Sequence, residues 1–478
     1  MTLEPLPRDV TQRTRAEART RAQRLSGGLG VLPGVAITVL LMLVFIVLDY
    51  RFDQDPHRVL KVGLGALVLL GIVGFPKFGL LVFPLVVPVL PWIPPTPIPG
   101  LNAINVLLFT IFGSFALPRL LGGRPLFRTS LLGKLLGVLF LLCALSIVRG
   151  AAFPTGYTFD VRNAVFNLIR TGTSFLVYFF VLAMVSGPAE RRRIWWAVMG
   201  GLMVESTLTI LLGRNGPSGR AIGSIGQANE LGAFLVVFAV ALIAMLPAMR
   251  GLWTRVVLLA TFGAASFGIV ISVSRAAMIA YLVGLVIVAL RTSRVMLFLI
   301  VLGALSAPLW IPDYVKDRIS GSQVEVEGSD EVALDRSSEA RLQTWQSILE
   351  VVKDHPLDGI GFTGLASVLP DIGSELGLDE ARDAAHNTYL RVTGELGIIG
   401  LAVFAWLIVT CWRLGDRAVR IARNRFDRAI GVGVCAATVG MAISCAFGDR
   451  FFSVVIANGF WMLCALAQDA VFEQERAA

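Results

Sequence analysis

The chain has few charged residues: only 16% of its 478 residues are Asp, Glu, Lys or Arg, whereas 55% are hydrophobic. Soluble domains carry roughly 25% charged residues, so this composition excludes an ordinary soluble protein. Strict alternation of apolar and polar residues is also missing, which argues against an outer-membrane barrel. Instead, apolar windows of roughly 17–25 residues follow one another from residue 31 to residue 468. The sequence therefore predicts an all-α, polytopic helical membrane protein.

Residues that bind metals are scarce. The chain has five cysteines and three histidines, and every cysteine lies in or beside an apolar run. This placement favours neither a disulfide framework nor a zinc cluster, and we expect no metal and no cofactor. One alternative stays open in "RFDQDPHR", where Asp53, Asp55 and His57 alternate as ligands of a divalent metal can. A short acidic loop between two spans is, however, usually only solvated.

About 14 transmembrane helices fit the apolar windows. Their centres lie near residues 40, 66, 84, 110, 139, 175, 203, 238, 262, 283, 303, 403, 438 and 460. The region 58–92 contains several prolines and is either two short spans or one span with a re-entrant piece. There is no internal repeat, so the inverted-repeat architecture of many transporters is not supported.

The arginine-rich connections all fall on one side of this arrangement. With the N-terminus inside, the inner connections are 119–134, 187–194, 250–255, 291–294 and 413–428. Cytoplasmic loops of membrane proteins collect Lys and Arg, so we expect both termini in the cytoplasm. The same bias accounts for the net charge of +9, and no nucleic-acid partner is expected.

Five regions follow from this topology. We expect a basic cytoplasmic tail (1–26), an N-terminal transmembrane bundle (27–312), a large periplasmic loop between spans 11 and 12 (313–388), C-terminal transmembrane helices (389–469) and a cytoplasmic tail (470–478). The loop holds 16 acidic and 6 basic residues.

The loop is long enough to have a structure of its own. Residues 337–356 predict a helix that Pro356 ends, because apolar residues follow each other at a spacing of three to four: Leu342, Trp345, Ile348 and Val352. We expect this stripe to lie on the outer membrane surface or on the mouth of the bundle. A glycine-rich turn and a second helix near 375–385 follow.

Cations also occur on the outer side, where the positive-inside bias disfavours them. Arg275 lies in the very short turn "SVSRAAM", and its alternative role is to reach lipid phosphates. The other outer candidates lie in the segment 213–234 and in the loop: Arg214, Arg220, Asn229, Arg341, His355 and His386.

Arginines together with one histidine fit a diphosphate substrate. Arginine binds phosphate oxygens bidentately and can stabilise the charge on a departing diphosphate. Histidine can accept a proton from an attacking hydroxyl near neutral pH. His355 follows a helix end, where a cation suits the dipole, so a structural role is favoured for it. Glu395 either holds Arg275 or Arg391 in place or caps the helix that it begins.

Four stretches carry a resemblance to a known family. "SRAAMIAYLVGL", "ARLQTWQSILEVVKDHPLDGIGFTG" and "HNTYLRVTGELGIIGL" resemble the signature of the bacterial O-antigen ligase and O-antigen polymerase superfamily. "GRAIGSIGQANELGAF" resembles that family's upstream Arg…Gly…Asn motif, and the resemblance covers roughly 213–410. It implies a multi-pass inner-membrane glycosyltransferase that moves a glycan from undecaprenyl diphosphate to an acceptor sugar on the periplasmic face. Such a reaction inverts the anomeric centre without a metal.

The resemblance also implies roles for individual residues. Arg220 and Arg275 would grip the donor diphosphate, and His386 would be the base or would orient the acceptor. Arg341 would help. The remaining candidates for substrate binding are Asn387, Asn229 and Arg214. The chain departs from the family pattern in its two extra spans, its basic N-terminal tail and in Gln227, which replaces a proline often found there.

We therefore expect a polymerase of undecaprenyl-diphosphate-linked repeat units. The alternatives are an O-antigen ligase that transfers the finished glycan to lipid A–core, and a transporter or flippase of lipid-linked glycans. The implied partners are a lipid-linked glycan donor, a glycan or lipid-linked acceptor, membrane lipids, a chain-length regulator and a flippase.

Overall fold

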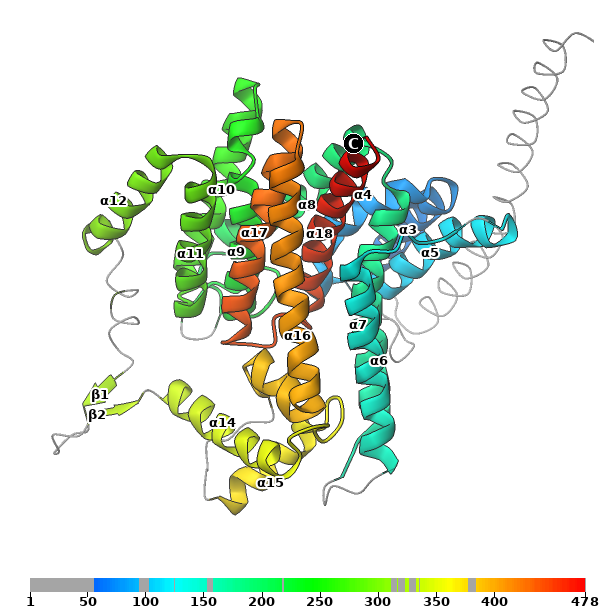
Figure 1. The fold of residues 1–478 in the computed structure, drawn as a ribbon. Helices are drawn as coiled ribbons and strands as arrows, with labels where there is room; N and C mark the ends of the chain where they lie inside the picture. The colour runs from blue at the N-terminus through cyan, green and yellow to red at the C-terminus, as the bar shows by residue number, and fades with distance from the viewer. Residues whose placement is uncertain are drawn as a thin grey trace, which may run out of the picture. The chain divides into compact units, whose positions relative to one another are not determined.

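The computed structural model describes residues 56–93, 103–123, 125–152, 158–216, 219–310, 316, 323–325, 332–334, 336–376 and 384–477. Within these ranges the chain is helical apart from one short hairpin (Figure 1). Ten of the described helices are long and apolar enough to cross a membrane. The prediction of a polytopic helical membrane protein is confirmed.

The chain separates into two compact units. The first contains α3 (Pro56–Gly74), α4 (Pro76–Val86) up to Phe83, and α5 (Ala103–Leu121) from Ile104 onward. Gly79 on α4 lies so close to α5 that a Cβ atom there would overlap the Ile111 side chain. The lack of a side chain at Gly79 thus sets how closely α4 and α5 pack.

The second unit holds the remaining elements. They are η1 (Leu90–Trp92), α6 (Leu131–Ala152), α7 (Val161–Met184), α8 (Pro188–Leu212), α9 (Ala228–Ile243), η3 (Leu246–Ala248), α10 (Leu252–Ile271), α11 (Arg275–Thr292), α12 (Arg294–Trp310), β1 (Gln323–Glu325), β2 (Val332–Leu334), α14 (Arg336–Asp354), α15 (Leu365–Glu375), α16 (Thr388–Ile421), α17 (Arg425–Cys445) and α18 (Val454–Arg476). The antiparallel strands β1 and β2 pair Gln323 with Leu334. The apolar window of α18 is wholly buried, and α17 packs on α9, α11, α16 and α18.

Thirteen of the fourteen predicted span centres fall inside a described helix. The centre near residue 40 and the tail 1–26 lie outside the described residues. The exact count of spans stays a prediction. With 11 residues, α4 is about 16 Å long, roughly half of the hydrocarbon thickness. That length agrees with the re-entrant interpretation of the region 58–92.

The two ends of α16 lie at opposite ends of the second unit (Figure 1). At one end the predicted inner connections meet: Arg128 pairs with Asp469 (2.6 Å), and Arg291 pairs with Asp416 (2.9 Å). At the other end α14 and α15 pack on the start of α16. The arginine-rich connections and the long loop thus occupy opposite ends, as the charge bias requires.

A buried ion network holds the arginine-rich end together. The guanidinium of Arg191 on α8 is fully buried and contacts Asp427 (3.0 Å), Asp469 (2.7 Å) and Glu473 (2.6 Å). A buried charge is tolerated only when it is paired. Arg191 therefore fixes α8 to both α17 and α18.

A break in α16 anchors the long loop. Gly397 has φ 67° inside this helix, a conformation that favours glycine. Around the break, the amide of Ile398 donates to the Pro356 carbonyl (2.9 Å), and the amide of Gly361 donates to the Glu395 carbonyl (3.0 Å). A Cβ at Gly397 would overlap the Leu357 carbonyl. The segment 356–361 is thus hydrogen-bonded directly to α16.

The loop has its own hydrophobic core. Trp345, Ile348 and Val352 pack in it with α15, whereas Leu342 is exposed. Because α14 also packs on α16, the stripe lies against the bundle, one of its two predicted positions. A further loop helix, α15, spans Leu365–Glu375 and contains Pro370. The helix predicted near 375–385 falls largely outside the described residues.

We predict that Gly397→Ala lowers the midpoint of thermal unfolding in detergent. The left-handed backbone and the overlap with the loop together should cost at least about 2 kcal/mol. Gly137→Ala on α6 is the matched control, because nothing lies within 4 Å of its Cβ position. Equal midpoints for the two variants would contradict the anchoring role.

We expect Arg191→Met to destabilise the protein by roughly 3–5 kcal/mol, since it leaves buried carboxylates without their partner. The exposed neighbour Arg193 provides the control Arg193→Met, which should behave like the wild type. The yield of monodisperse protein and its thermal unfolding midpoint are the measurements. A stable Arg191→Met variant would show that the network is dispensable.

Candidate active site

Arg220 holds the turn between α10 and α11. Its Nε donates to the Ser272 carbonyl (2.9 Å) and its Nη2 to Asn229 Oδ1 (2.7 Å), while the amide of Ala221 donates to the Ile271 carbonyl (3.0 Å). All of these acceptors are neutral. These bonds orient the guanidinium.

Arg275 is presented by the same turn. It is the first residue of α11 and follows Val273, whose φ of 50° is unusual for a β-branched residue. Such strained conformations collect at functional sites, where the surrounding structure enforces them. The Nη2 atom of Arg275 donates to Ser338 Oγ on α14 (3.3 Å). Arg220 and Arg275 thus share one turn, and that turn reaches the loop.

Helix α14 connects this turn to His386. Ser338, Arg341 and Trp345 stand at positions i, i+3 and i+7, so they share one face of α14. The indole Nε1 of Trp345 donates to the carbonyl of Ala385 (3.0 Å), directly before His386. Seven helical residues span roughly 10 Å. The arginine turn and the histidine are therefore bound to the same helix face, with Arg341 between them.

The backbone at His386 is held in a strained conformation. Its φ is 50°, which costs a residue other than glycine on the order of 1–3 kcal/mol. Next to it, Asn387 caps α16: its Oδ1 accepts hydrogen bonds from the amides of Tyr389 (3.0 Å) and Leu390 (3.2 Å). The hydroxyl of Thr388 donates to the Gly448 carbonyl (2.7 Å). Contacts of the residues before and after His386 therefore fix the position of this half-buried histidine.

The turn between α17 and α18 adds a residue that sequence reasoning missed. Arg450 is buried in this turn, and burial lowers its pKa while the carboxylate of Glu230 opposes the shift. The hydroxyl of Ser453 donates to Glu230 Oε1 at the start of α9. Since Gly448 in the same turn binds Thr388, the turn connects the histidine segment to the start of α9. Like Arg275, Arg450 is an arginine in a short turn on the predicted outer side, and this signal could have identified it.

Glu205 is a second missed residue. It is fully buried on α8 and accepts hydrogen bonds from the amide (3.0 Å) and the hydroxyl of Ser224. Gly223, with φ 57°, permits this approach, because a Cβ there would overlap the carboxylate. Glu205 thereby positions the loop that carries Arg220. A carboxylate inside an apolar span is rare and signals a role of this kind.

The structure settles the two open interpretations of nearby residues. Glu395 accepts from Arg391 on the same helix (3.2 Å), so its partner is Arg391 and not Arg275. His355 lies 3.1 Å from Arg149 Nη2 at the end of α6, where Arg149 also pairs with Asp358 (2.7 Å). The two contacts of Arg149 anchor the loop to α6, which agrees with the structural role favoured for His355.

Two further sets of candidates stay predictions. Arg214 is exposed, and its Nε donates to the carbonyl of Gly219, which directly precedes Arg220. The side chains of Asp53, Asp55 and His57 lie outside the part of the chain that the structure describes. In that part, no group of three His, Cys, Asp or Glu residues is placed to hold a metal ion.

Comparison with known proteins identifies one domain. Residues 256–405 match the family described as O-antigen ligase, and no curated protein matches the chain. The matched segment runs from α10 into α16 and contains Arg275, Arg341 and His386, whereas Arg220 and Asn229 precede it. The O-antigen ligase and polymerase superfamily indicated by the motifs is thereby confirmed for this segment.

Asn387 provides a test of the local geometry. We predict that Asn387→Ala loses about 1 kcal/mol of stability through the lost cap, and that Asn387→Ser restores it. Thermal unfolding in detergent measures both effects. Wild-type stability of Asn387→Ala would contradict the cap. A stable Asn387→Ser variant that turns over slowly would show that the amide nitrogen also contacts the substrate.

Proposed function

We propose that this chain, with its O-antigen ligase domain at residues 256–405, is a glycosyltransferase of the bacterial inner membrane that builds a surface polysaccharide. The observation that carries the proposal is the attachment of the Arg220–Arg275 turn and His386 to one face of α14. Oriented arginines and a fixed histidine bound to the same helix suit a donor whose diphosphate is displaced by a hydroxyl.

The reaction is a single displacement. The acceptor hydroxyl attacks C1 of the sugar on undecaprenyl diphosphate, the C1–O bond to phosphate breaks, and its electron pair leaves with the diphosphate. His386 accepts the hydroxyl proton and passes it to solvent. Attack opposite the leaving group inverts the anomeric centre.

The leaving group needs charge stabilisation rather than a proton. Arg275 and Arg220 supply guanidinium groups that hydrogen bonds to Ser338, Ser272 and Asn229 hold in place, so little reorganisation is required when charge develops. Arg341 lies on the same face of α14 as Ser338 and Trp345, and Arg450 adds a further buried cation. These groups carry the diphosphate without a metal in this mechanism.

The site faces the periplasm in this proposal. It lies at the end of the second unit that carries the loop, opposite the arginine-rich connections. Because Lys and Arg collect in cytoplasmic loops, both termini are placed in the cytoplasm and the lipid-linked donor is used at the outer face.

We favour polymerisation of repeat units as the specific reaction. The alternative is transfer of a finished glycan to lipid A–core, which the description of the matched family as O-antigen ligase favours. If the protein is a polymerase, its expected partners are a chain-length regulator and a flippase. Deletion-strain glycans separate the two: single repeat units on lipid indicate a polymerase, and full chains on undecaprenyl diphosphate indicate a ligase.

His386 is the residue to test first. We predict that His386→Ala lowers the release of undecaprenyl diphosphate from a lipid-linked glycan by roughly 100- to 10,000-fold, because the proton acceptor is lost. His355→Gln, which changes the other described histidine of the loop, should stay near the wild-type rate. Release of undecaprenyl diphosphate and formation of a new glycosidic bond are measured together with purified protein.

Two outcomes would contradict the proposal. Wild-type turnover by His386→Ala would remove the histidine from the mechanism. Movement of the lipid-linked glycan across vesicles without cleavage by the wild-type protein would indicate a transporter instead of an enzyme.

A further inference from the structure

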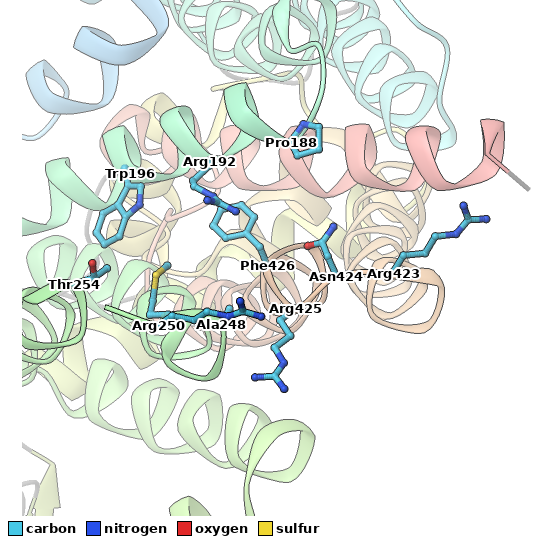
Figure 2. A pocket seen from close by; sticks show the side chains of 11 residues that line it. Pro188, Arg192, Trp196, Ala248, Arg250, Thr254, Arg423, Asn424, Arg425 and Phe426 are labelled. Atoms are coloured by element: carbon cyan, nitrogen blue, oxygen red, sulfur yellow. The ribbon is translucent and has the colours of Figure 1, made fainter. Parts of the chain in front are cut away.

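The second unit contains a cavity at the end opposite the candidate active site. It has a volume of about 850 Å³ and is formed by the start of α8, the connection from η3 to α10, and the turn between α16 and α17 (Figure 2). Neither the motifs nor the matched family assigns a role to this cavity.

The charge of the cavity is strongly positive. Its lining contains four arginines and no Asp or Glu: Arg192, Arg250, Arg423 and Arg425. The nearby carboxylate of Asp427 is bound by Arg191, and that of Glu190 accepts from Ser186. The acids beside the cavity thus have partners of their own, and the four arginines give its lining a net positive charge.

The N-termini of three helices also lie at the cavity. Helix α8 begins at Pro188, α10 at Leu252 and α17 at Arg425, and each contributes residues of its first turn or two to the lining. The N-terminus of a helix carries unpaired amide groups and a partial positive charge. Three such ends together with four arginines favour an anion with several acceptor oxygens, such as a phosphate.

Aromatic side chains shape the wall of the cavity. The guanidinium of Arg192 lies 5.1 Å from the centre of the Phe426 ring, and Trp196 lies on the same helix as Arg192, one turn further on (Figure 2). Stacking on a ring restricts an arginine and leaves its edge for hydrogen bonds. The cavity is therefore partly pre-organised for a ligand.

Exposed residues beside the cavity indicate that the phosphate belongs to a lipid. Leu252 and Trp253 directly precede the lining residue Thr254, and their side chains are 74% and 78% exposed. Large apolar and tryptophan side chains at the end of a span lie at the membrane–water interface. The cavity therefore opens at the level of the lipid headgroups on the arginine-rich side, where anionic lipids attract basic residues.

We propose that this cavity binds the phosphate headgroup of an anionic phospholipid from the inner leaflet. The arginines and helix ends take the phosphate oxygens, and the acyl chains run along the exposed start of α10. This site is separate from the diphosphate site at the other end of α16, so it does not depend on the proposed reaction.

The test uses the full-length protein in a neutral detergent, titrated with cardiolipin or phosphatidylglycerol and observed by native mass spectrometry. The double variant Arg250→Ala and Arg425→Ala should bind these lipids on the order of tenfold more weakly than the wild type. Phosphatidylcholine should bind weakly to both proteins, and inorganic pyrophosphate should not displace the anionic lipid.

A double variant with the same loss of charge outside the cavity is the control. Arg294 and Arg413 are exposed and do not line the cavity, so Arg294→Ala with Arg413→Ala should keep wild-type lipid affinity. Equal losses of lipid affinity in the two double variants would show that only the net charge of the protein matters. That result would overturn the proposal. Displacement of the lipid by pyrophosphate at similar concentrations would show that the site takes a soluble anion instead.

Discussion

A guanidinium enclosed by apolar helices must find hydrogen-bond acceptors, and this chain meets that requirement differently at its two ends. Arg191 is surrounded by carboxylates, so its charge is neutralised and its role is to fix helices. Arg220 and Arg275 are oriented through an amide, a carbonyl and a hydroxyl, which are neutral. Arginine binds phosphate oxygens bidentately, and the proposed chemistry depends on the orientation that these hydrogen bonds give the two guanidinium groups.

The loop fixes the positions of the oriented arginines relative to His386, so that these residues can form one site. It is bound to α16 at the break around Gly397, and its own core includes Ala385 beside His386. Trp345 and Ser338 then tie the histidine segment and Arg275 to one helix. Strained backbone at Val273 and His386 is maintained by these contacts, as is common where geometry serves chemistry.

Sequence reasoning succeeded where the signal is local. Apolar windows located the helices, and the charge bias placed the arginine-rich connections at one end. It gave less where contacts between elements decide: which side chains of the α14 stripe enter the loop core depends on α15 and α16. The charges of Glu205 and Arg450 stand out in the sequence, but their partners Ser224 and Glu230 are found only once the helices are packed.

The most direct measurement is a structure of the protein with a non-hydrolysable undecaprenyl-diphosphate sugar. The account predicts that the diphosphate lies against Arg220 and Arg275, with the anomeric carbon on the side of His386. A diphosphate bound away from these arginines, or in the cavity at the opposite end of α16, would contradict it.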